Sequence, residues 1–186
     1  MMSRLRPRLF LLRGLVVAAV TLAVLVAGAA RANDSIEEAR VKAAFVLNFI
    51  KFTSWPDGQG EATPTLTLCV IGGYALAGQL NALAGRNVQG RQVRLQPLEA
   101  QGGDAQCDAV FATMTDAVTL RSLQQLTGRR AALTISDQPG FVAQGGMIEL
   151  KIVDGRVRFV VNLAAARAAN LMLSSQLLQL ADRVVQ

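Results

Sequence analysis

The sequence has 186 residues, 52% of them hydrophobic, with 19 basic and 13 acidic side chains. Five basic residues and no acidic residue precede residue 33, which leaves 14 basic against 13 acidic residues, a net charge of +1. That balance gives little support for nucleic-acid binding. The absence of histidine removes the commonest general base and transition-metal ligand.

Residues 1–32 are typical of an export signal. Several arginines are followed by an apolar run at residues 15–27, and Ala30-Arg31-Ala32 places small residues where a signal peptidase cleaves. The alternative is an uncleaved membrane anchor, for which the apolar run is shorter than a span of roughly 20 residues. We expect cleavage after Ala32 and a single domain at 33–186, in the periplasm of a Gram-negative source.

A helix is expected over residues 36–53, with Asp34 or Ser35 as its cap and its end before Trp55-Pro56. Apolar residues occupy opposite sides of this helix, so it is buried on more than one side. Two interpretations stay open: the helix is enclosed within its own domain, or one side meets another chain.

Short buried strands then alternate with helices, and this pattern predicts a parallel sheet. A helix carrying Leu120 and Leu123 is expected to be capped by Thr115 or Asp116. The strands are expected at residues 66–71, 92–97, 108–113 and 131–135.

The C-terminal block predicts an antiparallel edge hairpin followed by a long helix. Residues 147–152 and 156–161 alternate in polarity around Asp154-Gly155, which favours a type I′ turn. Helical spacing then continues through Leu173, Leu177, Leu180 and Val184. The predicted fold is a three-layer α/β domain: a mixed, mostly parallel sheet with a C-terminal antiparallel hairpin and helices on both faces.

Two cysteines in an exported protein suggest a disulfide. Cys69 lies inside the first sheet strand and Cys107 immediately before the third. If these strands are neighbours, about 4.8 Å apart, the pair can form a bond. The alternative is two buried free thiols.

The loops after parallel strands meet at one sheet edge, where ligands commonly bind in open α/β folds. Residues of these loops could form a small-molecule site, although the same residue types are common in turns and caps. The run GGYALAG does not fit the G-x-G-x-x-G spacing of dinucleotide-binding proteins. The candidate ligand-binding residues are Gly72, Gly73, Thr113, Thr115, Ser136 and Asp137.

No nucleophile is accompanied by a recognisable base, because histidine is absent and no Ser-x-x-Lys occurs. Two cysteines also cannot make a four-thiolate zinc site. The sequence therefore predicts a protein that is not an enzyme and holds no metal or cofactor.

Two runs carry a resemblance to a known family: VKAAFVLNFIKFTSWP and GGMI…GRVRFVVNLAAARAANLMLSSQLLQLA. The segments LTLCVIGG, NVQGRQV, CDAVFAT and LTISDQPGFVAQGG fall between them in order. Together they resemble the YfiR-like family of periplasmic regulators over residues 37–185. The resemblance implies the Cys69–Cys107 pair; a second pair seen in some members has no counterpart between Leu133 and Val161.

By resemblance, the protein is expected to restrain a membrane diguanylate cyclase through its periplasmic portion and to lower cyclic-di-GMP. The alternative is a periplasmic small-ligand-binding or sensing module that serves another membrane receptor. The first helix ends in an aromatic and cationic group of a kind enriched at interfaces. The expected surface for the cyclase, or for a second copy in a homodimer, is bordered by Ile50, Lys51, Phe52 and Trp55.

Overall fold

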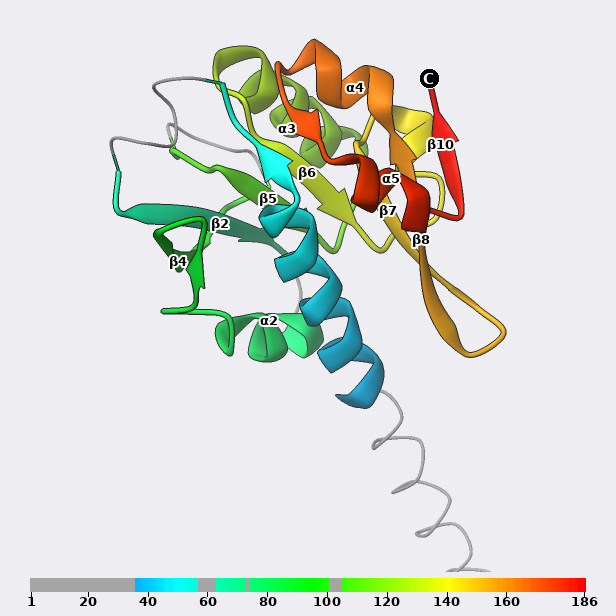
Figure 1. The fold of residues 1–186 in the computed structure, drawn as a ribbon, viewed down its shortest axis with the longest axis horizontal. Coiled ribbons are helices and arrows are strands. Elements are labelled where there is room, and N and C mark those ends of the chain that lie inside the picture. Colours follow the sequence, from blue (N-terminus) through cyan, green and yellow to red (C-terminus); the bar gives the residue numbers. More distant parts are fainter. Residues whose placement is uncertain (1–35, 57–62, 73, 101–104) are drawn as a thin grey trace, which may run out of the picture. The chain divides into compact units, whose positions relative to one another are not determined.

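The structure is a computed structural model that describes residues 36–56, 63–72, 74–100 and 105–186. The expected signal segment, the Asp34 or Ser35 cap and Gly73 lie outside these residues. Residues 39–186 form one compact unit. The first helix is described over residues 36–51. The later helices are α2 (Tyr74–Asn81), α3 (Ala117–Arg129), the 3₁₀ helix η1 (Val142–Gln144), α4 (Leu163–Ala168) and α5 (Ser175–Leu180) (Figure 1).

The described strands form an eight-stranded sheet and a separate two-stranded pair. The strands are β1 (Thr53–Ser54), β2 (Thr65–Ile71), β3 (Asn87–Val88), β4 (Arg91–Pro97), β5 (Ala109–Ala112), β6 (Leu133–Ser136), β7 (Ile148–Val153), β8 (Arg156–Asn162), β9 (Met172–Leu173) and β10 (Arg183–Val185). The eight strands run in the spatial order β10-β8-β7-β6-β5-β2-β4-β3, and β1 pairs with β9. Neighbours from β4 through β7 are parallel, whereas the β7–β8 hairpin is antiparallel. This confirms the mixed, mostly parallel sheet.

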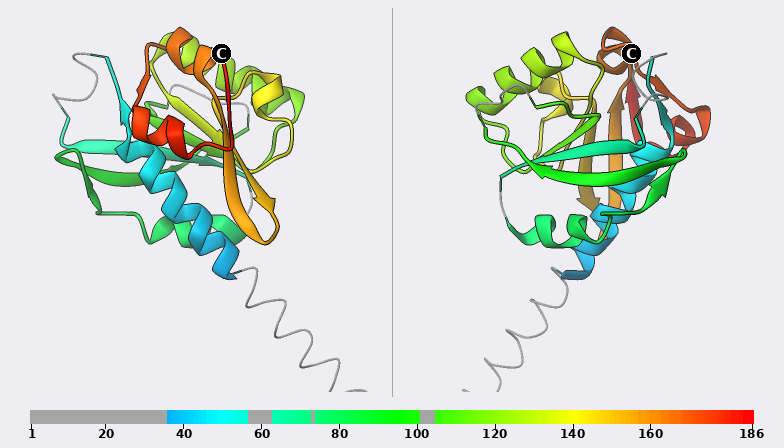
Figure 2. Two further views of the ribbon diagram at one scale, coloured as in Figure 1. Left: turned by 45° about the vertical axis from the view of Figure 1, so that its right-hand side comes forward. Right: turned by 90° about the vertical axis from the view of Figure 1, so that its left-hand side faces the viewer.

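Successive side chains of the central strands point to opposite faces of the sheet and fill two separate cores. In β2, Leu66 and Leu68 belong to the larger core, whereas Cys69 and Ile71 belong to the smaller one. The first helix and α2 cover one face, and α3 covers the other (Figure 2). The three-layer arrangement is therefore confirmed.

The first helix buries a broad apolar side and leaves a narrow stripe exposed. Phe49 is fully buried, and its ring centroid lies 4.9 Å from that of Phe159 on β8. Phe45, on the flank, packs against both rings at 5.9 Å. Most of the apolar girdle is thus enclosed within the domain. The exposed residues of this helix are Ile36, Glu37, Arg40, Ala44, Asn48 and Lys51.

This helix ends at residue 51, two residues before the expected Thr53. The Gln89 amide donates hydrogen bonds of 2.9 Å to the main-chain oxygens of both Lys51 and Thr53. Thr53 then pairs with Leu173 in β1 and β9. The chain leaves the helix early because these contacts hold it extended.

Two local predictions are confirmed. The Asp116 side chain caps α3 by accepting hydrogen bonds from the amides of Val118 and Thr119. Asp154 and Gly155 adopt φ of 50° and 68°, the two positive values that a type I′ turn requires.

The long C-terminal helix is a wrong prediction. Six-residue α4 ends near Asn170, whose φ of 58° departs from the helical region. Residues 172–173 then pair with β1, and Ser174 starts α5 by accepting a hydrogen bond from the Leu177 amide. The hairpin is also not the sheet edge, because β10 lies beside β8. Leucine spacing suited a helix, but capping and strand pairing divide the segment.

Candidate functional site

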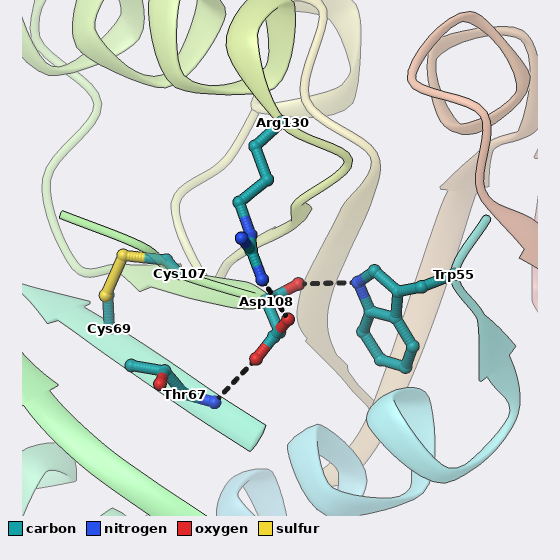
Figure 3. The surroundings of a disulfide bond; sticks show 6 residues. All are labelled: Trp55, Thr67, Cys69, Cys107, Asp108 and Arg130. Carbon is teal, nitrogen blue, oxygen red and sulfur yellow. Dashed lines mark hydrogen bonds and ion pairs between the residues drawn. A yellow bond between two sulfur atoms is a disulfide. The ribbon is translucent and has the colours of Figure 1, made fainter. Parts of the chain in front are cut away.

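The disulfide joins neighbouring parallel strands at the centre of the sheet. Cys69 lies within β2, and Cys107 lies two residues before β5, with 5.7 Å between their Cα atoms. Both side chains are fully buried, and the bond is drawn in Figure 3. The predicted pairing is confirmed, and the alternative of two free thiols is excluded.

Asp108, next to the disulfide, is a buried carboxylate with cationic partners on two sides. One oxygen accepts hydrogen bonds from the Thr67 amide at 2.8 Å and from the Arg91 guanidinium at 2.9 Å. The other accepts from the Arg130 guanidinium at 3.0 Å. Asp108 is only 2% exposed. Figure 3 shows Arg130 reaching Asp108 from the end of α3.

Sequence reasoning missed this ion cluster of Asp108, Arg91 and Arg130. A charged group at the start of a buried strand requires partners, because an unpaired buried charge is strongly unfavourable. The available signal was Asp108, which follows a cysteine at the start of a buried strand. Its partners, Arg91 and Arg130, lie 17 and 22 residues away in the sequence. Their identity follows only from the packing of β4 and α3 around β5.

Of the predicted interface residues, Trp55 lies in the interior. It is 9% exposed, and its indole Nε1 donates a 3.0 Å hydrogen bond to the main-chain oxygen of Asp108 (Figure 3). Ile50 is fully buried in the same core. These two side chains therefore support the adjoining surface from beneath.

Lys51 and Phe52 lie at the end of the first helix, where they reach the surface. Lys51 is exposed and Phe52 is half-buried, and the ammonium lies 5.8 Å from the centre of the Phe52 ring. Met172 on β9, 69% exposed, is paired with neighbouring Ser54. We call Lys51, Phe52 and Met172 the helix-end surface. Its contact with another chain stays a prediction.

The described members of the predicted ligand set follow the ends of β2, β5 and β6; they are Gly72, Thr113, Thr115, Ser136 and Asp137. The hydroxyls of Thr113 and Ser136 already bond to the protein. The Thr113 hydroxyl donates a 3.2 Å hydrogen bond to the main-chain carbonyl of Ile71. Ser136 donates to the Ala112 carbonyl at 2.7 Å and accepts from the Gln138 amide at 3.1 Å. Thr115 immediately precedes the α3 cap. These groups stabilise turns, and ligand binding by them stays a prediction.

Asp137 retains an unused polar atom at this edge. Its Oδ2 accepts a 2.8 Å hydrogen bond from the Lys42 ammonium of the first helix. Its Oδ1 is buried and has no hydrogen-bond partner among the residues that the structure describes. Among the described candidates, Asp137 is thus the residue whose buried side-chain acceptor has no partner.

Two further surveys cover the described residues. Within them, His, Cys, Asp and Glu form no group of three or more that could hold a metal ion. In the same ranges, the helices are too short or too polar to cross a membrane.

The fold and the central disulfide define a small disulfide-bonded α/β domain, and comparison with known families specifies it further. A family model described as YfiR/HmsC-like matches residues 39–182, and the chain belongs to this family. The match covers nearly all of the compact unit, so the resemblance in the sequence is confirmed. Comparison with curated proteins found no match.

Proposed function

We propose that this protein is a non-enzymatic periplasmic regulator that binds a membrane diguanylate cyclase and restrains it, so that cyclic-di-GMP falls inside the cell. Residues 1–32 would direct export. The observation that carries the proposal is membership of the YfiR/HmsC-like family over residues 39–182. The buried disulfide supports an oxidising compartment.

Restraint of this kind requires only differential binding. A regulator that prefers the inactive conformation of the cyclase shifts the equilibrium toward it, by no more than that difference in affinity. A hundredfold preference corresponds to about 2.7 kcal/mol. No chemical step is needed in the regulator.

The helix-end surface is the proposed contact. Phe52 offers an aromatic face, Lys51 offers a charge, and Met172 is an exposed, adaptable apolar side chain. Buried Trp55 and Ile50 hold this surface rigidly from below. Such support is favourable because an ordered surface loses less conformational entropy on binding.

The test measures binding and repression together. The protein is titrated against the purified periplasmic portion of a membrane diguanylate cyclase from the same organism, and cyclic-di-GMP is measured in cells that express both full-length proteins. Phe52→Ala is expected to raise the Kd about thirtyfold or more, and Lys51→Glu is expected to weaken repression. Arg94→Glu on β4 is the matched control, because Arg94 is an exposed cation on another element.

The outcomes separate the surface from the function. Wild-type protein that neither binds the cyclase nor lowers cyclic-di-GMP contradicts the proposed function. Normal repression by folded Phe52→Ala and Lys51→Glu variants contradicts only the choice of surface. Sedimentation of the same variants tests whether a second copy of this protein binds the helix-end surface instead. In that case the two substitutions would weaken the homodimer.

A second function is favoured by one observation: Asp137 Oδ1, at the carboxyl ends of the parallel strands, has no hydrogen-bond partner in the described part of the chain. The protein would then be a small-ligand-binding or sensing module that serves another membrane receptor. Asp137→Asn, compared with Asp154→Asn in the exposed hairpin turn, separates the two functions. A change in ligand response with cyclase repression intact would favour the sensing module.

A further inference from the structure

A pocket of about 280 Å³ lies between α3, η1 and α4, away from the residues assigned to function above. Leu123, Phe141 and Met147 are buried at its base, and Ala165 and Ala168 of α4 form one wall. Figure 1 shows α3 and α4 at the same end of the domain. None of the 14 lining residues carries a charge.

The base of the pocket is fixed by close packing rather than by adjustable side chains. The Phe141 ring occupies the space that a β-carbon at Gly146 would take, so only glycine allows the ring to lie there. Gly146 in turn donates a 2.9 Å hydrogen bond to the Phe141 carbonyl. The pocket therefore exists before any ligand arrives, which lowers the entropic cost of binding.

One polar group at the base has unused capacity. Thr134 is 3% exposed, lines the pocket, and accepts a 3.1 Å hydrogen bond from the Met147 amide. A hydroxyl can also donate one hydrogen bond. Within the described ranges, no acceptor takes that bond. A buried donor without an acceptor is unfavourable, so a ligand acceptor at this point would relieve the cost.

We propose that this pocket binds a small, neutral molecule that has an apolar body and one hydrogen-bond acceptor for the Thr134 hydroxyl. An uncharged lining would leave a charged ligand without a partner. An apolar cavity of roughly 150 Å³ is known to hold a benzene ring, so this pocket accommodates a ring with a short substituent. The proposal concerns binding alone and does not depend on which membrane protein the chain serves.

Three probes of similar size separate these requirements. Acetophenone has an aromatic ring and a carbonyl acceptor, ethylbenzene has the same shape without the acceptor, and benzoate carries a charge. Each is titrated into the ¹⁵N-labelled mature protein while the amide shifts of Gly146 and Met147 are followed. Acetophenone is expected to give saturable shifts and to bind about two- to tenfold more tightly than ethylbenzene. Benzoate is expected to bind most weakly.

Variants assign the binding to the pocket and to the hydroxyl. Ala168→Phe should fill the pocket and abolish the shifts. Ala164→Phe, on the same helix but outside the lining, should leave them unchanged. Thr134→Val should reduce acetophenone binding to the level of ethylbenzene, and Thr134→Ser should restore it. Ethylbenzene affinity reports whether the pocket survives each Thr134 substitution.

Several results would overturn the proposal. These are the absence of saturable shifts with all three probes, unchanged binding in Ala168→Phe, or benzoate binding as tightly as acetophenone. Equal affinities for acetophenone and ethylbenzene in the wild type would remove the role assigned to Thr134. Because the readout uses this protein alone, failure of the proposed cyclase regulation would not alter it.

Discussion

The indole of Trp55 donates a 3.0 Å hydrogen bond to the main-chain oxygen of Asp108, which adjoins the disulfide cysteine Cys107. The same oxygen accepts a 3.0 Å hydrogen bond from the amide of Leu133. The segment after the first helix is thereby attached to the centre of the sheet. The position of the helix-end surface therefore depends on the disulfide and on the Asp108 ion cluster.

Trp55→Phe tests this attachment because it keeps an aromatic ring and removes the donor. We expect a loss of about 1 kcal/mol in the free energy of unfolding, measured by urea denaturation. Trp55→Ala also leaves a cavity and should cost about 3–5 kcal/mol. Met172→Ala, an exposed control, should change stability by less than about 0.5 kcal/mol. A Phe variant as stable as the wild type would show that the hydrogen bond contributes nothing.

The ion cluster makes Asp108 the most sensitive charged residue described. Asp108→Asn leaves the buried Arg91 guanidinium without its counter-charge, so we expect a loss of about 3–5 kcal/mol in the same assay. Arg130→Ala should cost less, because the Arg130 side chain is 27% exposed and Asp108 keeps Arg91. Equal effects of both substitutions would mean that the pair with Arg130, and not the pair with Arg91, accounts for the contribution of Asp108.

The disulfide should contribute strongly to stability. It closes a loop with a sequence separation of 38, for which the chain-entropy model gives about 3–4 kcal/mol. Thiol titration of the denatured, unreduced protein should find no free thiol, and reduction should lower the midpoint of thermal unfolding. A Cys69→Ser/Cys107→Ser variant should match the reduced protein and respond no further to reductant. Two titratable thiols in the denatured, unreduced protein would contradict the bond.

The sequence predicted the elements whose signals are local. The Asp116 cap, the Asp154-Gly155 turn and the buried strands each follow from residue type and spacing. Strand order was less accessible: a Cys69–Cys107 bond required β2 and β5 to be neighbours, and the structure shows that they are. Local chemistry was therefore sufficient for the individual elements, whereas the order of the strands in the sheet comes from the structure.

The features that the sequence did not predict depend on contacts between distant residues. The leucine spacing after Asn162 suited one helix, but pairing of Leu173 with Thr53 divides it. Burial of Trp55 likewise depends on an acceptor 53 residues away. At the candidate site, residue types identified the aromatic and cationic group but not which members reach the surface. Only the packed structure supplies that information.

Export should remove the signal segment, which lies outside the described residues. We expect the N-terminus of protein recovered from the periplasm to be Asn33, as determined by N-terminal sequencing. Ala32→Arg places a large cation at the cleavage site and should block processing. Intact Met1 on the wild-type protein in the membrane fraction would instead support the alternative of an uncleaved anchor.

The α3 cap gives stability a defined dependence on pH. Hydrogen bonds from the backbone amide of Thr119, the largest cause, and of Val118 lower the pKa of Asp116 below its ordinary value of 3.8. Because the folded state favours the charged form, the stabilising contribution of Asp116 is present above pH 3.8 and is lost as pH falls through the lower folded pKa.

Asp116→Asn keeps a capping oxygen without the charge. The thermal midpoint of the wild type should therefore exceed that of the variant at about pH 7 and converge with it in stronger acid, as measured by circular dichroism. Added salt should reduce the difference at pH 7, because the charge is exposed and screened. A difference that stays constant from neutral to acid pH would assign the effect to the side-chain amide and not to the charge of Asp116.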